Sequence, residues 1–529
     1  MFNSQLQPIP GDGNEQLDVS SIGRTNRPHS EEEQLYIRNI LLAAESLLQS
    51  GTIDGDLRRR EETVDLIGRC KIALAPHKRL PPDVLRSIFH FCAEARVQFP
   101  LVSKRGGIDQ DLHLLRITHV CSAWRQLALE TPALWSDISI YLSETEWKQH
   151  DKTLSSARQW FERAQDMRRS LFIHFVVGLY FSPHSHDSWE QLLEFMAQYR
   201  LEELELVYPI NRVALKLPDH VWPSIEHLHL ETQNDGQASA GGPQLFSNFG
   251  KLSNLRHLKI SGSYHLDGMD RIVPWHQLRT FEVKASMGCP VTPSSCLDAL
   301  RQSRLLERCR ITLSKEPSFT STVISTEEKI VLANMDYFEA EFLDSSGVPM
   351  FLQPLVMPNI TTFSLITGYI LRLSCAALIG IIQCSRGMRR IRHLNIGLTS
   401  TVLDVGVLLE LLPSLHSISI RTGYLAGDVI KRLSSGKLGP RLCDIVLNIL
   451  HDADQILSMV ELRYQNATQS LDREQIEDTP CPFKSIRIPS VNESLYRNRI
   501  ELLSEKCDAM IRLDIDENED EISYGSGNE

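Results

Sequence analysis

The chain has 529 residues, of which 42% are hydrophobic and 23% charged, and its formal net charge is −12 at pH 7. These proportions are typical of a globular protein and exclude a collagenous or wholly disordered chain. No apolar run approaches the roughly 18 residues that span a bilayer, and the N-terminus lacks the pattern of a secretory signal, so we expect no membrane association. The eleven cysteines are never spaced as CxxC, which favours a reducing cytoplasmic or nuclear location over a disulfide framework or a zinc ribbon.

Charge and composition set the two ends of the chain apart. Residues 1–29 contain few large apolar side chains and are predicted to be disordered. Residues 514–529 carry seven acids and no base, and we expect 516–529 to form an acidic disordered tail. The rest of the chain is nearly neutral, so it has no basic footprint for nucleic acid and we expect no nucleic-acid partner.

Residues 30–76 predict a helical hairpin. Ser30 and Glu33 have the spacing of a capping box, and an apolar stripe with helical periodicity follows as far as Gly51. A second helix is expected from Asp56 to Leu74. The stripe covers too few heptads for a strong coiled-coil signal, so internal packing is preferred over an oligomerising coiled coil.

Residues 77–142 contain two further amphipathic segments that cannot form a core alone. The first begins with Leu80-Pro81-Pro82, and Pro82 suits a first helical turn. Its apolar side chains are expected on one helix face, and they are Val84, Leu85, Ile88, Phe89 and Cys92. A second helix is expected to end at Thr131-Pro132 and to present Leu115, His119, Val120, Trp124 and Leu127.

These segments resemble the F-box, specifically the F-box proteins of mushroom-forming fungi. The resemblance covers about sixty residues and depends on the residues Leu80, Pro81, Pro82, Ile88, Phe89, Val120, Cys121, Trp124, Arg125, Leu134 and Trp135. The segment from Trp160 to Val177 and the lead-in from Ser30 also look like that family. The resemblance implies that 77–142 is an F-box domain that binds the Skp adaptor of a cullin-type ubiquitin ligase. The adaptor-binding residues that it implies are Leu80, Pro81, Pro82, Val84, Leu85, Ile88, Phe89, Val120, Cys121, Trp124 and Arg125. The alternative is that these residues serve only as the core of a helical module.

From Leu201 onward an apolar pattern recurs: one apolar residue, a second three positions later and a third two positions after that. The central residues are Leu204, Leu228, Leu258, Phe281, Cys309, Phe338, Phe363, Leu394, Ile418, Ile445, Ile486 and Leu513. They recur every 23–31 residues, except for one step of 41 residues that we expect to hide a longer helix over Ala453–Leu471. Polar residues between the apolar ones indicate strands with one buried face, and helical segments such as 297–306 and 405–412 lie between them.

A strand and a helix in each unit of this length are typical of leucine-rich repeats. The predicted fold class is therefore α/β: an N-terminal helical F-box module, then an irregular leucine-rich-repeat solenoid over 143–515 with a parallel sheet on its concave face. A globular α/β domain with an ordinary mixed sheet is the alternative.

Residues that flank the strand centres are expected to face the concave surface. Over the second to fifth repeats they include imidazole and cationic side chains that form a possible target-binding set: His227, His229, His257, Lys259, Arg308 and Arg310. Three interpretations compete for this set. It is a solvated polar face, an anion-attracting patch for an acidic or phosphorylated peptide, or a metal site formed by the three histidines.

The sequence contains no P-loop, nucleophile elbow, dinucleotide-binding turn, HExxH helix or EF-hand loop. The run from Pro183 to Asp187 is read as a polar loop rather than a metal site, and Cys289 and Cys296 have no histidine partner pattern. We therefore expect a non-enzymatic protein without a cofactor. The expected partners are a Skp-type adaptor, through it a cullin, and an unidentified protein target. A ligase-independent scaffold or regulatory protein is the alternative function.

Overall fold

A computed structural model describes most of the chain. The described residues are 19–24, 29–51, 56–76, 80–93, 96–99, 113–143, 150–176, 183–209, 219–233, 251–262, 273–285, 291–313, 329–343, 348–367, 375–384, 388–397, 402–420, 423–447, 453–471, 480–489, 493–507 and 510–514. The expected acidic tail lies outside them. The chain forms two compact units, the first from Met1–Tyr141 and Asp151–Leu171, the second from Leu142–His150 and Phe172–Glu529.

The first unit begins with the expected helical hairpin, α1 (Glu31–Gln49) and α2 (Leu57–Ala73). The predicted capping box is confirmed, since the Ser30 side chain accepts from the Glu33 amide and the Glu33 carboxylate accepts from the Ser30 amide. The prediction of disorder was wrong for residues 19–24: a 3-10 turn, η2 (Val19–Ser21), precedes Ile22, whose side chain is fully buried between the two helices. Residues 1–18 and 25–28 of that prediction lie outside the described residues. Ile22 fills the hairpin core, and the Arg69 guanidinium donates to the Val19 and Ser20 carbonyls, so this segment is held against α2.

Three short helices follow: α3 (Pro82–Cys92), α4 (His113–Val120) and α5 (Ser122–Leu129), with a 3-10 turn η5 (Pro132–Trp135). The single helix expected before Thr131 is therefore two helices. The chain breaks at Cys121, which has extended backbone angles (φ −161°, ψ 168°) and caps α5. A residue with extended angles cannot continue an α-helix, so the single helix face predicted across this break does not form.

Two tryptophans join the end of this helical module to the strands that follow. The Trp135 and Trp160 rings lie 4.6 Å apart, and Trp160 also meets Phe99 at 5.7 Å. Phe99 belongs to β1 (Val97–Phe99), which pairs in parallel with β2 (Asp137–Ser143), and Trp160 belongs to α6 (His150–Arg163). Residues 151–171 therefore belong to the first unit, beyond the boundary expected at residue 142.

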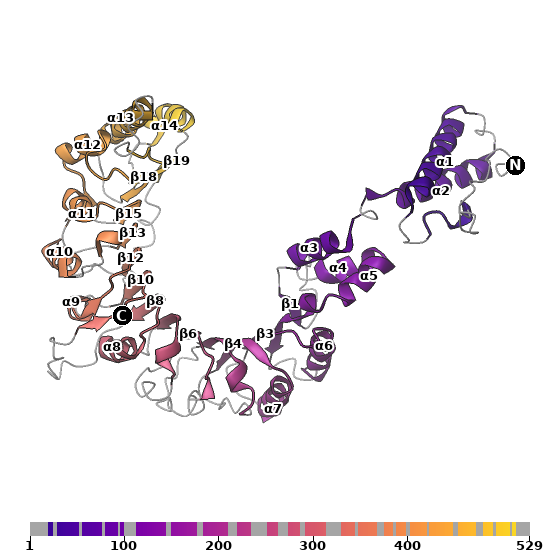
Figure 1. The fold of residues 1–529 in the computed structure, drawn as a ribbon, viewed down its shortest axis with the longest axis horizontal. Coiled ribbons are helices and arrows are strands. Elements are labelled where there is room, and N and C mark those ends of the chain that lie inside the picture. Colours follow the sequence, from indigo (N-terminus) through magenta and orange to yellow (C-terminus); the bar gives the residue numbers. More distant parts are fainter. Residues whose placement is uncertain are drawn as a thin grey trace, which may run out of the picture. The chain divides into compact units, whose positions relative to one another are not determined.

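The second unit is built on a long parallel sheet (Figure 1). Its strands, after β3 (Arg169–Val176) at the boundary, are β4 (Leu201–Pro209), β5 (His227–Gln233), β6 (His257–Gly262), β7 (Thr280–Ala285), β8 (Arg308–Leu313), β10 (Tyr337–Phe342), β12 (Thr362–Thr367), β13 (His393–Ile396), β15 (Ser417–Ile420), β17 (Asp444–Leu447), β18 (Ser485–Pro489) and β19 (Met510–Asp514). Every described pairing between them is parallel and joins strands that follow each other in this order. The α/β class with a parallel sheet is confirmed, and an ordinary mixed sheet is not what these strands form.

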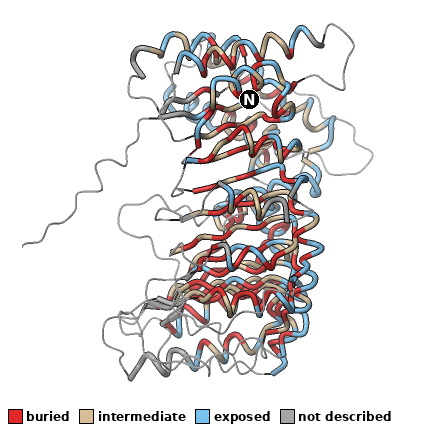
Figure 2. Tube along the Cα trace, turned by 90° about the vertical axis from the view of Figure 1, so that its left-hand side faces the viewer, coloured by how far each residue is buried: buried red, intermediate tan, exposed pale blue. Residues whose placement is uncertain are grey.

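The apolar pattern in the sequence predicts the register of this sheet. Eleven of the twelve expected central residues, from Leu204 to Ile486, pair with one another from strand to strand. The twelfth was wrong: Ile486 pairs with Ile511, not with Leu513. The error is a shift of two residues along one strand, which keeps the same face inward and so leaves the apolar pattern unchanged. Buried positions recur from strand to strand as a result (Figure 2).

Helices cover one face of the sheet (Figure 1). The described helices of this unit are α7 (Pro183–Ala197), α8 (Pro293–Gln302), α9 (Val348–Leu352), α10 (Cys375–Cys384), α11 (Val405–Leu411), α12 (Gly427–Ser434), α13 (Ala453–Leu471) and α14 (Glu493–Cys507). The helix α13 has the bounds that the 41-residue step predicts. Short 3-10 turns also precede β5, β7 and β13, and two-residue strand pairs, β9 (Ile330–Val331) with β11 (Leu355–Val356) and β14 (Leu403–Asp404) with β16 (Gly423–Tyr424), lie outside the long sheet. None of the helices in these described stretches is long and apolar enough to cross a bilayer.

A buried arginine ties the last helices together. Arg463 of α13 is fully buried and donates to the carbonyls of Leu433, Gly439, Pro440, Leu442 and Cys481 at 2.7–3.2 Å. Leu433 lies in the last turn of α12, whose carbonyls lack helical partners. Burial lowers the pKa of Arg463 to about 10, so the guanidinium remains charged at neutral pH and its donors satisfy these carbonyls.

Replacing Arg463 with Met should lower the free energy of unfolding by about 2–4 kcal/mol, because several buried carbonyls lose their donor. Arg463→Lys should also destabilise the protein, since one ammonium group cannot reach carbonyls on all sides. Chemical denaturation of both variants and of the wild type measures the effect. A Met variant as stable as the wild type would contradict this role.

The aligned strand centres should be intolerant of charge. Leu258→Asp or Leu394→Asp places a carboxylate at a position that is at most 2% exposed, and should unfold the neighbouring strands. Thr362→Asp changes the opposite face of the sheet and should be tolerated. Equal melting temperatures for the three variants would contradict the register.

Candidate functional site

Helix α3 has apolar side chains on two faces. Leu85 and Phe89 are buried against the module, with 8% and 0% of their surface exposed, and the Phe89 ring lies 5.1 Å from that of Trp124. Val84, Ile88 and Phe91 are 43%, 36% and 74% exposed. Their spacing of four and three residues puts them on one stripe along the helix. An apolar stripe that the protein itself leaves uncovered is a candidate docking surface.

The motif around Cys121 builds the corner between α4 and α5. The Cys121 thiol accepts from the Trp124 amide at 3.4 Å and so caps α5. The Arg125 guanidinium donates to the Thr118 carbonyl at 2.9 Å, near the end of α4. These residues therefore hold the two helices at an angle, which is a structural role.

The sequence-predicted adaptor-binding residues thus divide into two groups. Leu85, Phe89, Cys121, Trp124 and Arg125 hold the module together. Pro81, Pro82, Val84, Ile88 and Val120 are exposed and have no such role, the last being 51% exposed at the end of α4, while Leu80 is half-buried. Arg125 is exposed as well, although it bonds to α4. The expectation that the apolar residues from Val84 to Cys92 share one helix face was wrong. Leu85 and Phe89 face the module, whereas Val84 and Ile88, each one position earlier in the helix, face away from it. Sequence analysis missed Phe91, which its seven-residue spacing from Val84 could have revealed.

A second candidate surface is the face of the sheet opposite the helices. The residue before each strand centre forms the leading row of this face, and the residue after it forms the trailing row. Along the nine strands from β4 to β15, the leading row is Glu203, His227, His257, Thr280, Arg308, Tyr337, Thr362, His393 and Ser417. The trailing row is Glu205, His229, Lys259, Glu282, Arg310, Glu339, Ser364, Asn395 and Ser419. All six residues of the predicted target-binding set therefore lie on one face, on β5, β6 and β8.

Oppositely charged neighbours pair across strands in the trailing row. Arg310 forms a bidentate pair with Glu339, at 2.8 and 3.1 Å. This hydrogen bonding raises the pKa of Arg310. His229 bonds through Nδ1 to the Glu205 carboxylate. The predicted cationic cluster is therefore partly neutralised by carboxylates interleaved with it.

The leading row contains stacked planar groups instead. The His227 and His257 rings lie parallel, with centroids 4.0 Å apart and an interplanar angle of 9°. Burial, and then the neighbouring His227, lower the pKa of His257, which favours the neutral form of this ring. Arg308 lies over the Tyr337 ring at 4.9 Å.

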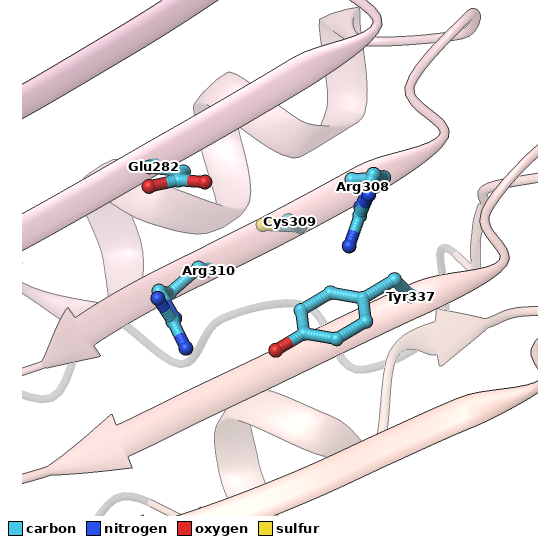
Figure 3. Close-up of a pocket in the computed structure, with 5 residues that line it drawn as sticks. All are labelled: Glu282, Arg308, Cys309, Arg310 and Tyr337. Atoms are coloured by element: carbon cyan, nitrogen blue, oxygen red, sulfur yellow. The ribbon is translucent and has the colours of Figure 1, made fainter. Parts of the chain in front are cut away.

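Arg308 and Tyr337 line a pocket of about 130 Å³ together with Glu282, Cys309 and Arg310 (Figure 3). Sequence analysis missed Tyr337 and Glu339. The centre between them, Phe338, belongs to the weakest instance of the apolar pattern, so its flanking residues gave no signal. The hydroxyl of Tyr337 donates to Glu339, which links the two rows.

The remaining sequence predictions concern metal ligands and reactive cysteines. Among the residues that can be described, no three His, Cys, Asp or Glu side chains are grouped so that they could hold a metal ion, and His227 and His257 stack face to face instead of converging. The run from Pro183 to Asp187, expected as a loop, is the start of α7. Cys296 is fully buried and its pKa is raised by desolvation, which opposes a reactive thiolate, while Cys289 lies outside the described residues.

No protein-family model matches the chain, and no curated protein matches it either.

The capping role of Cys121 can be tested directly. Cys121→Ala should lower the free energy of unfolding by about 1 kcal/mol because α5 loses its cap, whereas Cys121→Ser supplies a better acceptor and should be neutral or stabilising. Thermal denaturation of both variants is the measurement. A serine variant less stable than the alanine variant would contradict the capping role.

Proposed function

We propose that the protein is a substrate-receptor subunit of a cullin-type ubiquitin ligase, in which the F-box-like module 77–142 docks on a Skp-type adaptor. The observation that carries the proposal is the exposed apolar stripe of α3, Val84, Ile88 and Phe91. It lies within the segment that resembles an F-box, and the residues that hold the module are different ones. A hydrophobic stripe carried by a separately packed helix is suited to insertion into an apolar groove of a partner.

The second unit is proposed to be an irregular leucine-rich-repeat solenoid that holds the protein target. Its support is the aligned parallel strands, with the described helices on one side of the sheet and the two polar rows on the other. In such a solenoid this face is the concave surface, which these proteins use for binding. The chain's contribution is then proximity, because a bound target has a high effective concentration near the conjugating enzyme.

A ligase-independent scaffold is the second candidate. It is favoured by the structural roles of Leu85, Phe89, Trp124 and Arg125. A helical module that binds no adaptor would need these residues for its stability as well. That function explains the motif but leaves the exposed stripe of α3 without a partner.

The double variant Ile88→Asp with Val120→Asp tests adaptor binding. Each carboxylate would enter a desolvated apolar interface, so binding should weaken by about 4 kcal/mol, or roughly a thousandfold in Kd. Both positions are exposed in the free protein, so the fold should be retained. The measurement is co-purification of a Skp-type adaptor with full-length protein, followed by titration.

A matched control is Leu35→Asp with Leu42→Asp, since these two side chains are 60% and 64% exposed on α1 of the same unit. This control should bind the adaptor as the wild type does. Undiminished binding by the Ile88/Val120 variant, or no binding by folded wild-type protein, would overturn the ligase role.

A further inference from the structure

The two rows of the exposed sheet face differ in how their charges are satisfied. In the trailing row, Arg310 already has both of its bonds to the Glu339 carboxylate. In the leading row, Arg308 is exposed and stacks on Tyr337. Within the described part of the chain, no carboxylate forms an ion pair with Arg308.

The Tyr337 ring is held in place by the trailing row. Its hydroxyl donates to the Glu339 carboxylate, which also accepts both bonds from Arg310. The Glu339 carboxylate is thus occupied by Tyr337 and Arg310. Because the ring is fixed and only half-buried, it is a platform that orients the guanidinium above it before any ligand arrives.

The surroundings of the pocket direct an anion to Arg308. Glu282 lines the pocket and pairs in register with Arg310, so its negative charge disfavours an anion beside Arg310. Arg308 lies at the other end, next to Tyr337 (Figure 3). The volume of about 130 Å³ has room for the end of one side chain.

We propose that Arg308, stacked on Tyr337, anchors one anionic side chain of the bound protein, a carboxylate or a phosphate. Arg310 and Glu339 are positioning residues that hold Tyr337 and do not contact the ligand. This inference rests on the proposed function, because it assigns a ligand to the target-binding face. Of the six residues in the predicted target-binding set, only Arg308 is proposed to bind the anion. Its guanidinium has donors available for a bidentate bond to a carboxylate or a phosphate.

The test uses full-length protein and a phage-displayed library of random octapeptides. Peptides selected on wild type should be enriched several-fold in Asp or Glu at one position. Arg308→Gln should lose this enrichment. The matched control, Arg301→Gln, removes the same charge from α8 on the helix side of the sheet and should keep it.

A selected peptide then separates the two sources of negative charge. Replacing its key Glu with Gln should weaken binding about 10-fold or more, as expected for a charge-assisted hydrogen bond. Phosphoserine at that position should bind more tightly than Glu if phosphate is the natural group, and no more tightly if carboxylate is. Acid enrichment that survives Arg308→Gln, selected peptides without acids, or failure to select any peptide would overturn the proposal.

The positioning role has its own readout. Tyr337→Phe keeps the ring but loses the hydroxyl bond to Glu339, so it should bind the selected peptide more weakly than wild type and still prefer Glu over Gln. Tyr337→Leu should lose most of the preference for Glu over Gln at an unchanged melting temperature. Equal preference in both variants would refute the platform. Adaptor binding should be unaffected by Arg308→Gln, so failure of this inference and failure of the ligase role are distinguishable.

Discussion

The second unit depends on one constraint: the alignment of a single apolar side chain from each strand with the same position in the next. From Leu204 to Ile511 these side chains form a continuous buried column across parallel strands. No strand could bury its apolar face alone, so each depends on its two neighbours. The alignment also forces every residue beside a strand centre onto the opposite face, and thereby creates the leading and trailing rows.

The helical module combines a buried core with an apolar stripe that remains exposed on α3. The two features lie on different faces of the same helix. Leu85 and Phe89 pack inward against Trp124, while Val84, Ile88 and Phe91 remain exposed. Charge on the outer stripe should therefore affect binding more than folding, and this separation makes the proposed role accessible to mutation.

Much of the fold could be predicted because periodicity reports burial. The strand centres, the register of eleven strands and the bounds of α13 all followed from spacing alone. The register of β19 could not, since a two-residue shift leaves the same face buried. The break at Cys121 was missed because a cysteine cap depends on backbone angles that the helical apolar pattern does not reveal. The ion pairs of the site were its least predictable feature. The sequence indicated Arg308 and Arg310 as equivalent cations, and the structure shows that Arg310 is bonded to Glu339 whereas Arg308 lies over Tyr337.

Hydrogen–deuterium exchange of the full-length protein, with and without a purified Skp-type adaptor, tests the central claim most directly. We expect the adaptor to slow exchange in peptides covering α3 and the end of α4, and to leave peptides covering β5 to β10 unchanged. Protection confined to the strands of the second unit, or no protection at saturating adaptor, would contradict the assignment of docking and target recognition to separate surfaces.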